Sequence, residues 1–318
     1  MLLVLVLMVH TNIKSMMMRL FKIILVGLFC ATSNVAHSMV NIFACEPEWE
    51  ALAKEIGGEK VKTFSATHAM QNPHYIRARP SLINKAVKAD IIFCSGADLE
   101  VGWLPLLLQK ASGNVQQGTK GYLMASDFVK VLEKTMVTDR TMGDVHPEGN
   151  PHLHLNPHNI FLLAKELTKR LELIDATNQS FYRSRLDNFI LRWEEAINRW
   201  EKKSSDLKGM QIVIHHKTFS YLIDWLELTE VGSLEVKPGI PPTASHLEGL
   251  LQQFKTKSPD VIIRTPFDPE DGSIWLSEKI STPAIIMPYT INGNDNSTDL
   301  FALFENSINL LKGAMNDQ

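Results

Sequence analysis

Four histidines lie close together near the middle of the 318-residue chain. His146, His152, His154 and His158 belong to the segment GDVHPEGNPHLHLNPHN, which begins at Gly143. Imidazole is the most common protein ligand for zinc and related transition metals. Three prolines in the segment exclude a continuous helix. We therefore predict a loop whose side chains converge on a metal ion.

Other histidines follow predicted strands. His74 lies in the loop after the predicted strand 60–64, and His215 and His216 come directly after the predicted strand 210–214. Ligands of open α/β sheets bind beyond the carboxyl ends of the strands. We expect His74 to face the same cleft as the histidine loop. Because neighbouring residues there point to opposite faces, only one of His215 and His216 is expected to face it.

The rest of the chain predicts strands that alternate with helices, the pattern of open parallel α/β sheets. The predicted strands are 40–45, 60–64, 89–94, 210–214, 230–234, 260–264 and 284–287. The predicted helices are 48–56, 81–88, 103–108, 126–132, 160–174, 178–203, 219–226, 245–254 and 300–312, and residues 272–280 separate the last two predicted strands.

The helix 178–203 contains no Gly or Pro and would be about 39 Å long. It lies between the two α/β patterns and suits a rigid connector. We therefore expect two open parallel-sheet α/β lobes joined by one long backbone helix, with a metal site in the cleft between them. The expected domains are an N-terminal extension and signal peptide (1–38), an N-terminal lobe (39–177), the linking helix (178–206) and a C-terminal lobe (207–318).

The N-terminus predicts export. A basic stretch, MMMRLFK at 16–22, precedes a short apolar run, and Ala36-His37-Ser38 offers the small residues of a signal-peptidase site. The mature chain would begin at Met39 in a periplasm. Neither N-terminal apolar run reaches the length of about 20 residues that a membrane span needs. Leu28-Phe29 before Cys30 differs from the small residues that precede a lipidated cysteine.

Net charge and cysteine content bear on the possible partners and on disulfide bonding. A formal net charge of -3 gives no basic surface for nucleic acid. Separately, we expect the protein to be a monomer. Beyond the signal peptide only Cys45 and Cys94 remain, each at the end of an apolar run. A disulfide in an oxidising compartment and two buried thiols are both open.

The chain from Met39 to Lys312 resembles the metal-binding solute receptors of ABC transporters that import zinc or manganese. Four features carry the resemblance in the family's order: NPHYIRARPS around His74, NPHLHLNP around His152, HKTFSYL from His216, and the long helix. The resemblance implies that His74, His152 and His216 are metal ligands. It also implies metal capture outside the inner membrane and delivery to an ABC permease.

The chain departs from this family at the fourth ligand. The family has an Asp just after the last strand, where this chain reads IIMPYT from Ile285. We predict Asp268 as the fourth ligand, with Asp295 or a water molecule as alternatives. His146 and His154 are either an auxiliary metal site or solvated side chains.

Three neutral imidazoles suit zinc, at about 2.0–2.1 Å, whereas manganese sites carry more carboxylate oxygen. We therefore expect zinc, with manganese as the alternative, and a binding protein instead of an enzyme. A zinc-dependent hydrolase is the main alternative, because catalytic zinc also uses three ligands and an open position. The chain contains no HExxH motif, which argues against a hydrolase. Glu148 is the nearest candidate for the general base that hydrolysis would need. A receptor for a siderophore or other organic ligand would need an aromatic- or Arg-lined cleft.

Overall fold

The computed structural model describes Met18, residues 39–135, Gly143 and residues 146–316. The predicted signal peptide therefore lies almost wholly outside the described residues. Residues Met39–Gln318 form a single compact unit, and the description below concerns this unit alone.

Two four-stranded parallel sheets form the two lobes. The first sheet has the strand order β2-β1-β3-β4 and the second β6-β5-β7-β8. The first sheet contains β1 (Val40–Ala44), β2 (Val61–Ser65), β3 (Ile91–Cys94) and β4 (Tyr122–Met124), and the second contains β5 (Gln211–Ile214), β6 (Thr229–Ser233), β7 (Val261–Arg264) and β8 (Ala284–Ile286). Every residue of β3 and β7 is buried, as expected for central strands covered on both faces.

Helices pack around both sheets. The helices before residue 179 are α2 (Pro47–Gly57), α3 (Pro80–Val87), α4 (Leu104–Leu108) and α5 (Pro157–Ile174). The later ones are α6 (Gln179–Lys203), α7 (Ser220–Trp225), α8 (Ala244–Gln253), α9 (Asp271–Ile280) and α10 (Leu300–Asn316). Short 3-10 turns include η2 (Pro73–Tyr75) and η6 (Leu153–Leu155).

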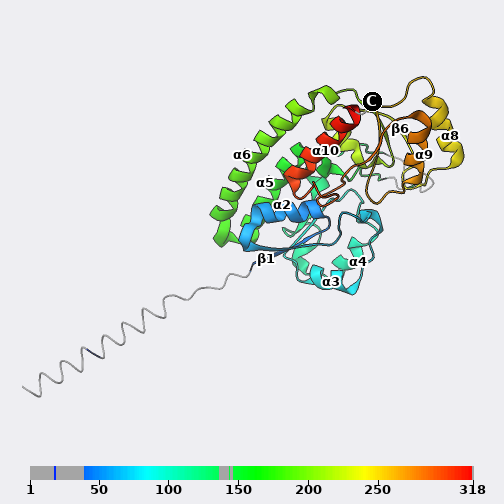
Figure 1. Cartoon of the computed structure of the whole chain (residues 1–318). Coiled ribbons are helices and arrows are strands. Elements are labelled where there is room, and N and C mark those ends of the chain that lie inside the picture. Colours follow the sequence, from blue (N-terminus) through cyan, green and yellow to red (C-terminus); the bar gives the residue numbers. More distant parts are fainter. Residues whose placement is uncertain (1–17, 19–38, 136–142, 144–145, 317–318) are drawn as a thin grey trace, which may run out of the picture. The chain divides into compact units, whose positions relative to one another are not determined.

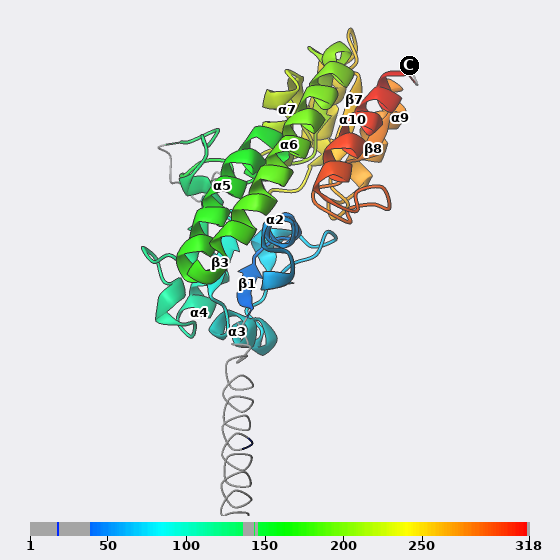
Figure 2. The same cartoon turned by 90° about the vertical axis from the view of Figure 1, so that its left-hand side faces the viewer.

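The long helix α6 connects the N-terminal lobe, which precedes it, to the C-terminal lobe, which follows it (Figures 1 and 2). It packs on α2 and α5 of the first lobe and on α10 of the second. Its buried face is largely aromatic and includes Tyr182, Phe189, Trp193 and Trp200. One hydrophobic cluster joins this face to residues of both sheets. The predicted fold class, two parallel-sheet lobes with a long backbone helix, is confirmed.

Two local predictions were wrong. β4 was not predicted, because its three residues YLM are too few to show a strand pattern. The predicted helix 126–132 is replaced by a single 3-10 turn at Ala125–Asp127, after which the chain is irregular.

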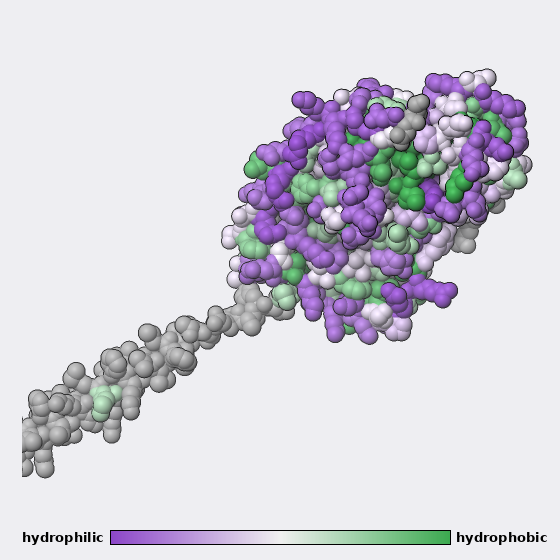
Figure 3. All heavy atoms as spheres, viewed as in Figure 1, coloured by the Kyte–Doolittle hydropathy of each residue, from purple (hydrophilic) through white to green (hydrophobic). Residues whose placement is uncertain are grey.

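Among the described residues, no helix is both long enough and apolar enough to cross a membrane. Hydrophilic residues cover most of the face of Met39–Asn316 that Figure 3 shows, with hydrophobic residues in separate spots. The most exposed large hydrophobic side chains of the unit include Val101 and Tyr75, at 65% and 64%.

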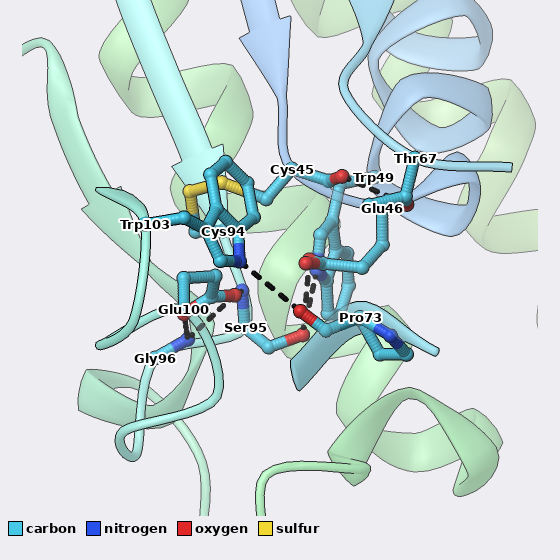
Figure 4. Close-up of a disulfide and its surroundings, with 10 residues drawn as sticks. All are labelled: Cys45, Glu46, Trp49, Thr67, Pro73, Cys94, Ser95, Gly96, Glu100 and Trp103. Atoms are coloured by element: carbon cyan, nitrogen blue, oxygen red, sulfur yellow. Dashed lines mark hydrogen bonds between the residues drawn. A yellow bond between two sulfur atoms is a disulfide. The ribbon is translucent and has the colours of Figure 1, made fainter. Parts of the chain in front are cut away.

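Cys45 and Cys94 form a disulfide, which decides between the two alternatives left open by the sequence. The disulfide joins the carboxyl ends of the adjacent strands β1 and β3, and both cysteines are fully buried (Figure 4). Beside it, the Glu100 carboxylate accepts hydrogen bonds from the amides of Ser95 and Gly96. Burial raises the pKa of the Glu100 carboxyl to about 7.

Candidate metal centre

His74, His152 and His216 come together at one point. Each offers one ring nitrogen, and these three atoms lie within 4.8 Å of one another. The ring centroids are 5.4 Å apart for His74 and His152, 5.7 Å for His74 and His216, and 5.9 Å for His152 and His216. Three stretches of chain that are distant in sequence therefore meet here.

An oxygen atom lies within hydrogen-bonding distance of Nδ1 in each of the three rings. These contacts are Asn72 Oδ1 to His74 at 2.7 Å, Tyr289 Oη to His152 at 3.1 Å, and Glu235 Oε2 to His216 at 2.7 Å. A histidine that binds a metal through Nε2 carries its proton on Nδ1 and donates it to such an acceptor. Nε2 is therefore the nitrogen of each ring that can bind an ion, although Nε2 of His74 lies 3.0 Å from Nε2 of His146.

Local sequence chemistry fixes His74. Asn72 Oδ1 also accepts a hydrogen bond from the backbone amide of His74 and so caps the turn η2. The indole N–H of Trp103 donates to the Pro73 carbonyl at 3.1 Å (Figure 4). Trp103 is fully buried beside the disulfide, so the turn that presents His74 is attached to the core of the first lobe.

Asn150 ties the histidine segment to the third ligand stretch. Its side-chain Oδ1 accepts from the amide of His152 at 2.9 Å, and its Nδ2 donates to the Lys217 carbonyl at 2.7 Å. The Tyr221 hydroxyl donates to the Asn150 carbonyl at 2.9 Å. His152 and His216 are therefore held in a fixed relation by residues of both lobes.

The electrostatic environment favours the neutral form of His74 and His152. Burial, followed by the nearby His216 and His146 rings, lowers the pKa of His74 well below its ordinary value. Burial also lowers the pKa of His152, with smaller contributions from the neighbouring histidines. Nε2 of His152 is buried and has no hydrogen-bond partner among the described residues. Neutral imidazole with a free nitrogen is the form that binds transition metals, so these residues fit a metal ion.

Residues 42–314 match the family described as ZnuA, zinc-uptake complex component A periplasmic. The chain belongs to this family.

The relatives extend along most of the chain. A metal ABC transporter substrate-binding lipoprotein, ScbA, of Streptococcus cristatus is 23% identical over 80% of this chain and 84% of its own length. The manganese ABC transporter substrate-binding lipoprotein PsaA of Streptococcus pneumoniae is 24% identical over 84% of this chain and 88% of its own length.

Solved structures show the same fold. A crystal structure of ZnuA superimposes with a TM-score of 0.70 at 17% identity, covering 87% of this chain and 98% of the other. The cadmium-bound periplasmic metal binding protein of Candidatus Liberibacter asiaticus gives 0.69 at 14% identity, covering 86% and 99%. At these identities the likeness concerns the fold alone.

In this member of the ZnuA family, Asp268 lines the same cavity of about 120 Å³ as the three histidines. Its Oδ2 accepts a hydrogen bond from the Thr265 amide at 2.8 Å. It does not belong to the group of ligand atoms within 4.8 Å, which among the described residues contains only the three histidines. Asp295 is exposed.

His146 lies at the edge of the site. Its Nε2 is 3.0 Å from Nε2 of His74, and the ring centroids are 5.1 Å apart. It lines a second cavity, of about 290 Å³, together with His152 and His216.

The remaining histidines of the segment, His154 and His158, lie outside the group of three. His154 is neither an auxiliary ligand on a flexible loop nor solvated, because the turn η6 buries its ring against Glu48 and Tyr289. His158 is exposed beside Glu201.

His216 belongs to the group and the adjacent His215 does not, although both line the 120 Å³ cavity.

Sequence reasoning missed the residues that orient the rings. Asn72 stands two residues before His74, so the Asn-Pro-His order carried a usable signal. Glu235 follows the end of β6, and Tyr289 lies in the IIMPYT stretch, where the sequence comparison with the family concerned only a carboxylate. Neither has a local pattern that links it to a histidine.

Proposed function

We propose that this protein captures a divalent transition metal ion outside the inner membrane and delivers it to an ABC permease for import. Zinc is the proposed cargo, with manganese as the alternative. The observation that carries the proposal is the convergence of three buried or half-buried imidazoles, each oriented through Nδ1 by an oxygen. The family description names zinc uptake, whereas PsaA is named for manganese.

The proposed ligands are Nε2 of His74, His152 and His216. An all-imidazole set favours zinc over manganese, which prefers oxygen ligands. For the fourth position, Asp268 remains the prediction from the sequence, and its carboxylate would have to turn from the Thr265 amide. His146 is the second candidate, because its Nε2 lies 3.0 Å from that of His74.

Location outside the cytoplasm agrees with the names of the family and of its relatives and with the disulfide, since disulfides persist in oxidising compartments. We infer export to the periplasm through the signal peptide and a monomer in solution. The relatives named above are lipoproteins; the bulky residues before Cys30 favour a protein without a lipid.

We propose lobes 39–177 and 207–318 around the linking helix 178–206. A hydrolase and a siderophore receptor gain no support from the relatives.

Calorimetric titration of the metal-free protein with zinc and with manganese tests this function. We expect one tight zinc site and weaker manganese binding. His216→Ala should weaken zinc binding by about 100-fold or more, because the site loses one of its three protein ligands.

His158→Ala is the matched control, since His158 comes from the same histidine segment but is exposed away from the group; its zinc affinity should equal that of the wild type. Asp268→Asn and His146→Ala compared in the same titration assign the fourth position to whichever variant loses affinity. Weak zinc binding that His216→Ala does not change would refute the proposed site.

A further inference from the structure

Tyr289 reaches the histidine segment from the opposite lobe. It lies in the loop between β8 and α10, and only 1% of it is exposed. Its hydroxyl is 3.1 Å from Nδ1 of His152, and its backbone carbonyl oxygen is 2.9 Å from Nε2 of His154. Its ring meets both imidazoles nearly at right angles, with centroids 5.5 Å and 4.9 Å away. A residue of the C-terminal lobe is thus inserted against two histidines of the N-terminal lobe.

The three converging histidines differ in where their Nδ1 partners come from. His74 is oriented by Asn72 of its own turn. His216 is oriented by Glu235, which follows the neighbouring strand of the same sheet. Only His152, of these three, has an Nδ1 partner that belongs to the other lobe. The orientation of this ring therefore depends on the position of the β8–α10 loop.

That loop is attached to the N-terminal lobe by a second residue. The hydroxyl of Thr290 donates a hydrogen bond to Oε2 of Glu48 on α2, and both residues are buried. Oε1 of the same carboxylate is 3.1 Å from Nδ1 of His154. The backbone carbonyl of Tyr289 and the side chain of the next residue, Thr290, therefore both attach this part of the loop to the N-terminal lobe, and an orienting group needs such support.

We propose that Tyr289 is a positioning residue of the metal site, whose hydroxyl accepts a hydrogen bond from Nδ1–H of His152 and so directs the Nε2 lone pair of His152 at the ion. The inference rests on the proposed function, because it takes His152 as a ligand. The free Nε2 of His152 agrees with this tautomer. Displacement of the β8–α10 loop would weaken metal binding without removing any ligand.

Tyr289→Phe tests the proposal, because it keeps the ring packing and removes only the acceptor. Loss of such an outer partner weakens metal binding by about 10- to 100-fold, and we expect a zinc Kd raised by that factor in calorimetric titration. The control is Tyr182→Phe, which removes another buried tyrosine hydroxyl, one that donates to Asp175 away from the histidines. Its zinc Kd should match the wild type even if its stability falls.

The tautomer of His152 in the metal-free protein gives a readout that needs no metal. Long-range nitrogen–proton NMR correlations should show the proton on Nδ1 in the wild type and a mixture of both tautomers in Tyr289→Phe. A proton on Nε2 in the wild type, unchanged tautomers in the variant, or a variant Kd within twofold of the wild type would each overturn the positioning role. A wild type that binds neither zinc nor manganese would instead refute the proposed function, and the tautomer would still report on Tyr289.

Discussion

Glu100 places an ionisable group in the core of the N-terminal lobe, where burial raises its pKa from 4.5 to about 7. The folded protein therefore keeps this proton at pH values where the unfolded chain has lost it. The stabilisation due to Glu100 is complete below pH 4.5 and is lost as the pH rises to about 7. A shift of this size corresponds to about 3 kcal/mol at most.

We predict that the stability of Glu100→Gln relative to the wild type increases from pH 5 to pH 8, because the wild-type carboxyl group loses its proton over this range whereas the amide stays neutral. The gain in the free energy of unfolding should approach about 2–3 kcal/mol. Urea unfolding of the metal-free proteins at both pH values measures it. Glu59→Gln, at an exposed site beside Lys60, should show no such trend. An equal effect of Glu100→Gln at both pH values would contradict the prediction.

Residue type and position predicted a histidine cluster, but only the resemblance to the metal receptors singled out His152 among the loop histidines and His216 over His215. His74 and His216 each follow a predicted strand, and His152 lies in a segment that prolines keep from being helical. Their orienting partners were not predictable in the same way. Glu235 and Tyr289 contact histidines 19 and 137 residues away, and only the assembled fold brings them together.

Helix α6 was predicted as 178–203 and runs from Gln179 to Lys203, because a long sequence without Gly or Pro leaves few other structures. The short strand β4 was missed because three residues carry no periodicity. The turn η6 was also unexpected. An extended strand would have put His152 and His154 on one face, whereas the turn sends His154 toward Glu48.

Trp193 is the central packing residue of α6. It is fully buried, contacts the rings of Phe189 and Phe304, and donates its indole N–H to the Pro157 carbonyl. We predict that Trp193→Ala lowers the free energy of unfolding by about 3–5 kcal/mol, measured by urea denaturation. Leu191→Ala, on the exposed face of the same helix, should change it by less than about 0.5 kcal/mol. A similar loss in both variants would refute the central role of Trp193.

At the scale of the whole molecule, the disulfide closes a loop of 49 residues within the first lobe. Replacing both cysteines by alanine should lower the free energy of unfolding by about 2–4 kcal/mol, because the unfolded chain regains the freedom of that loop. Urea unfolding of the oxidised wild type and the double variant measures the loss. Adding a dithiol should destabilise the wild type and leave the double variant unchanged; an equal response of both would show that the disulfide is not the cause.

The order of the segments along the chain also sets an order of assembly. During synthesis, domains generally fold as units starting from the N-terminus. Cys45 and Cys94 both lie in the first third of the sequence, whereas His216 and Tyr289 belong to its last third. A chain that enters an oxidising compartment N-terminus first can therefore oxidise its cysteines and complete its first sheet while the third histidine is still unavailable. A nascent or truncated chain that is already oxidised should hold no tightly bound ion, so metal capture is the last property that this protein acquires as it folds.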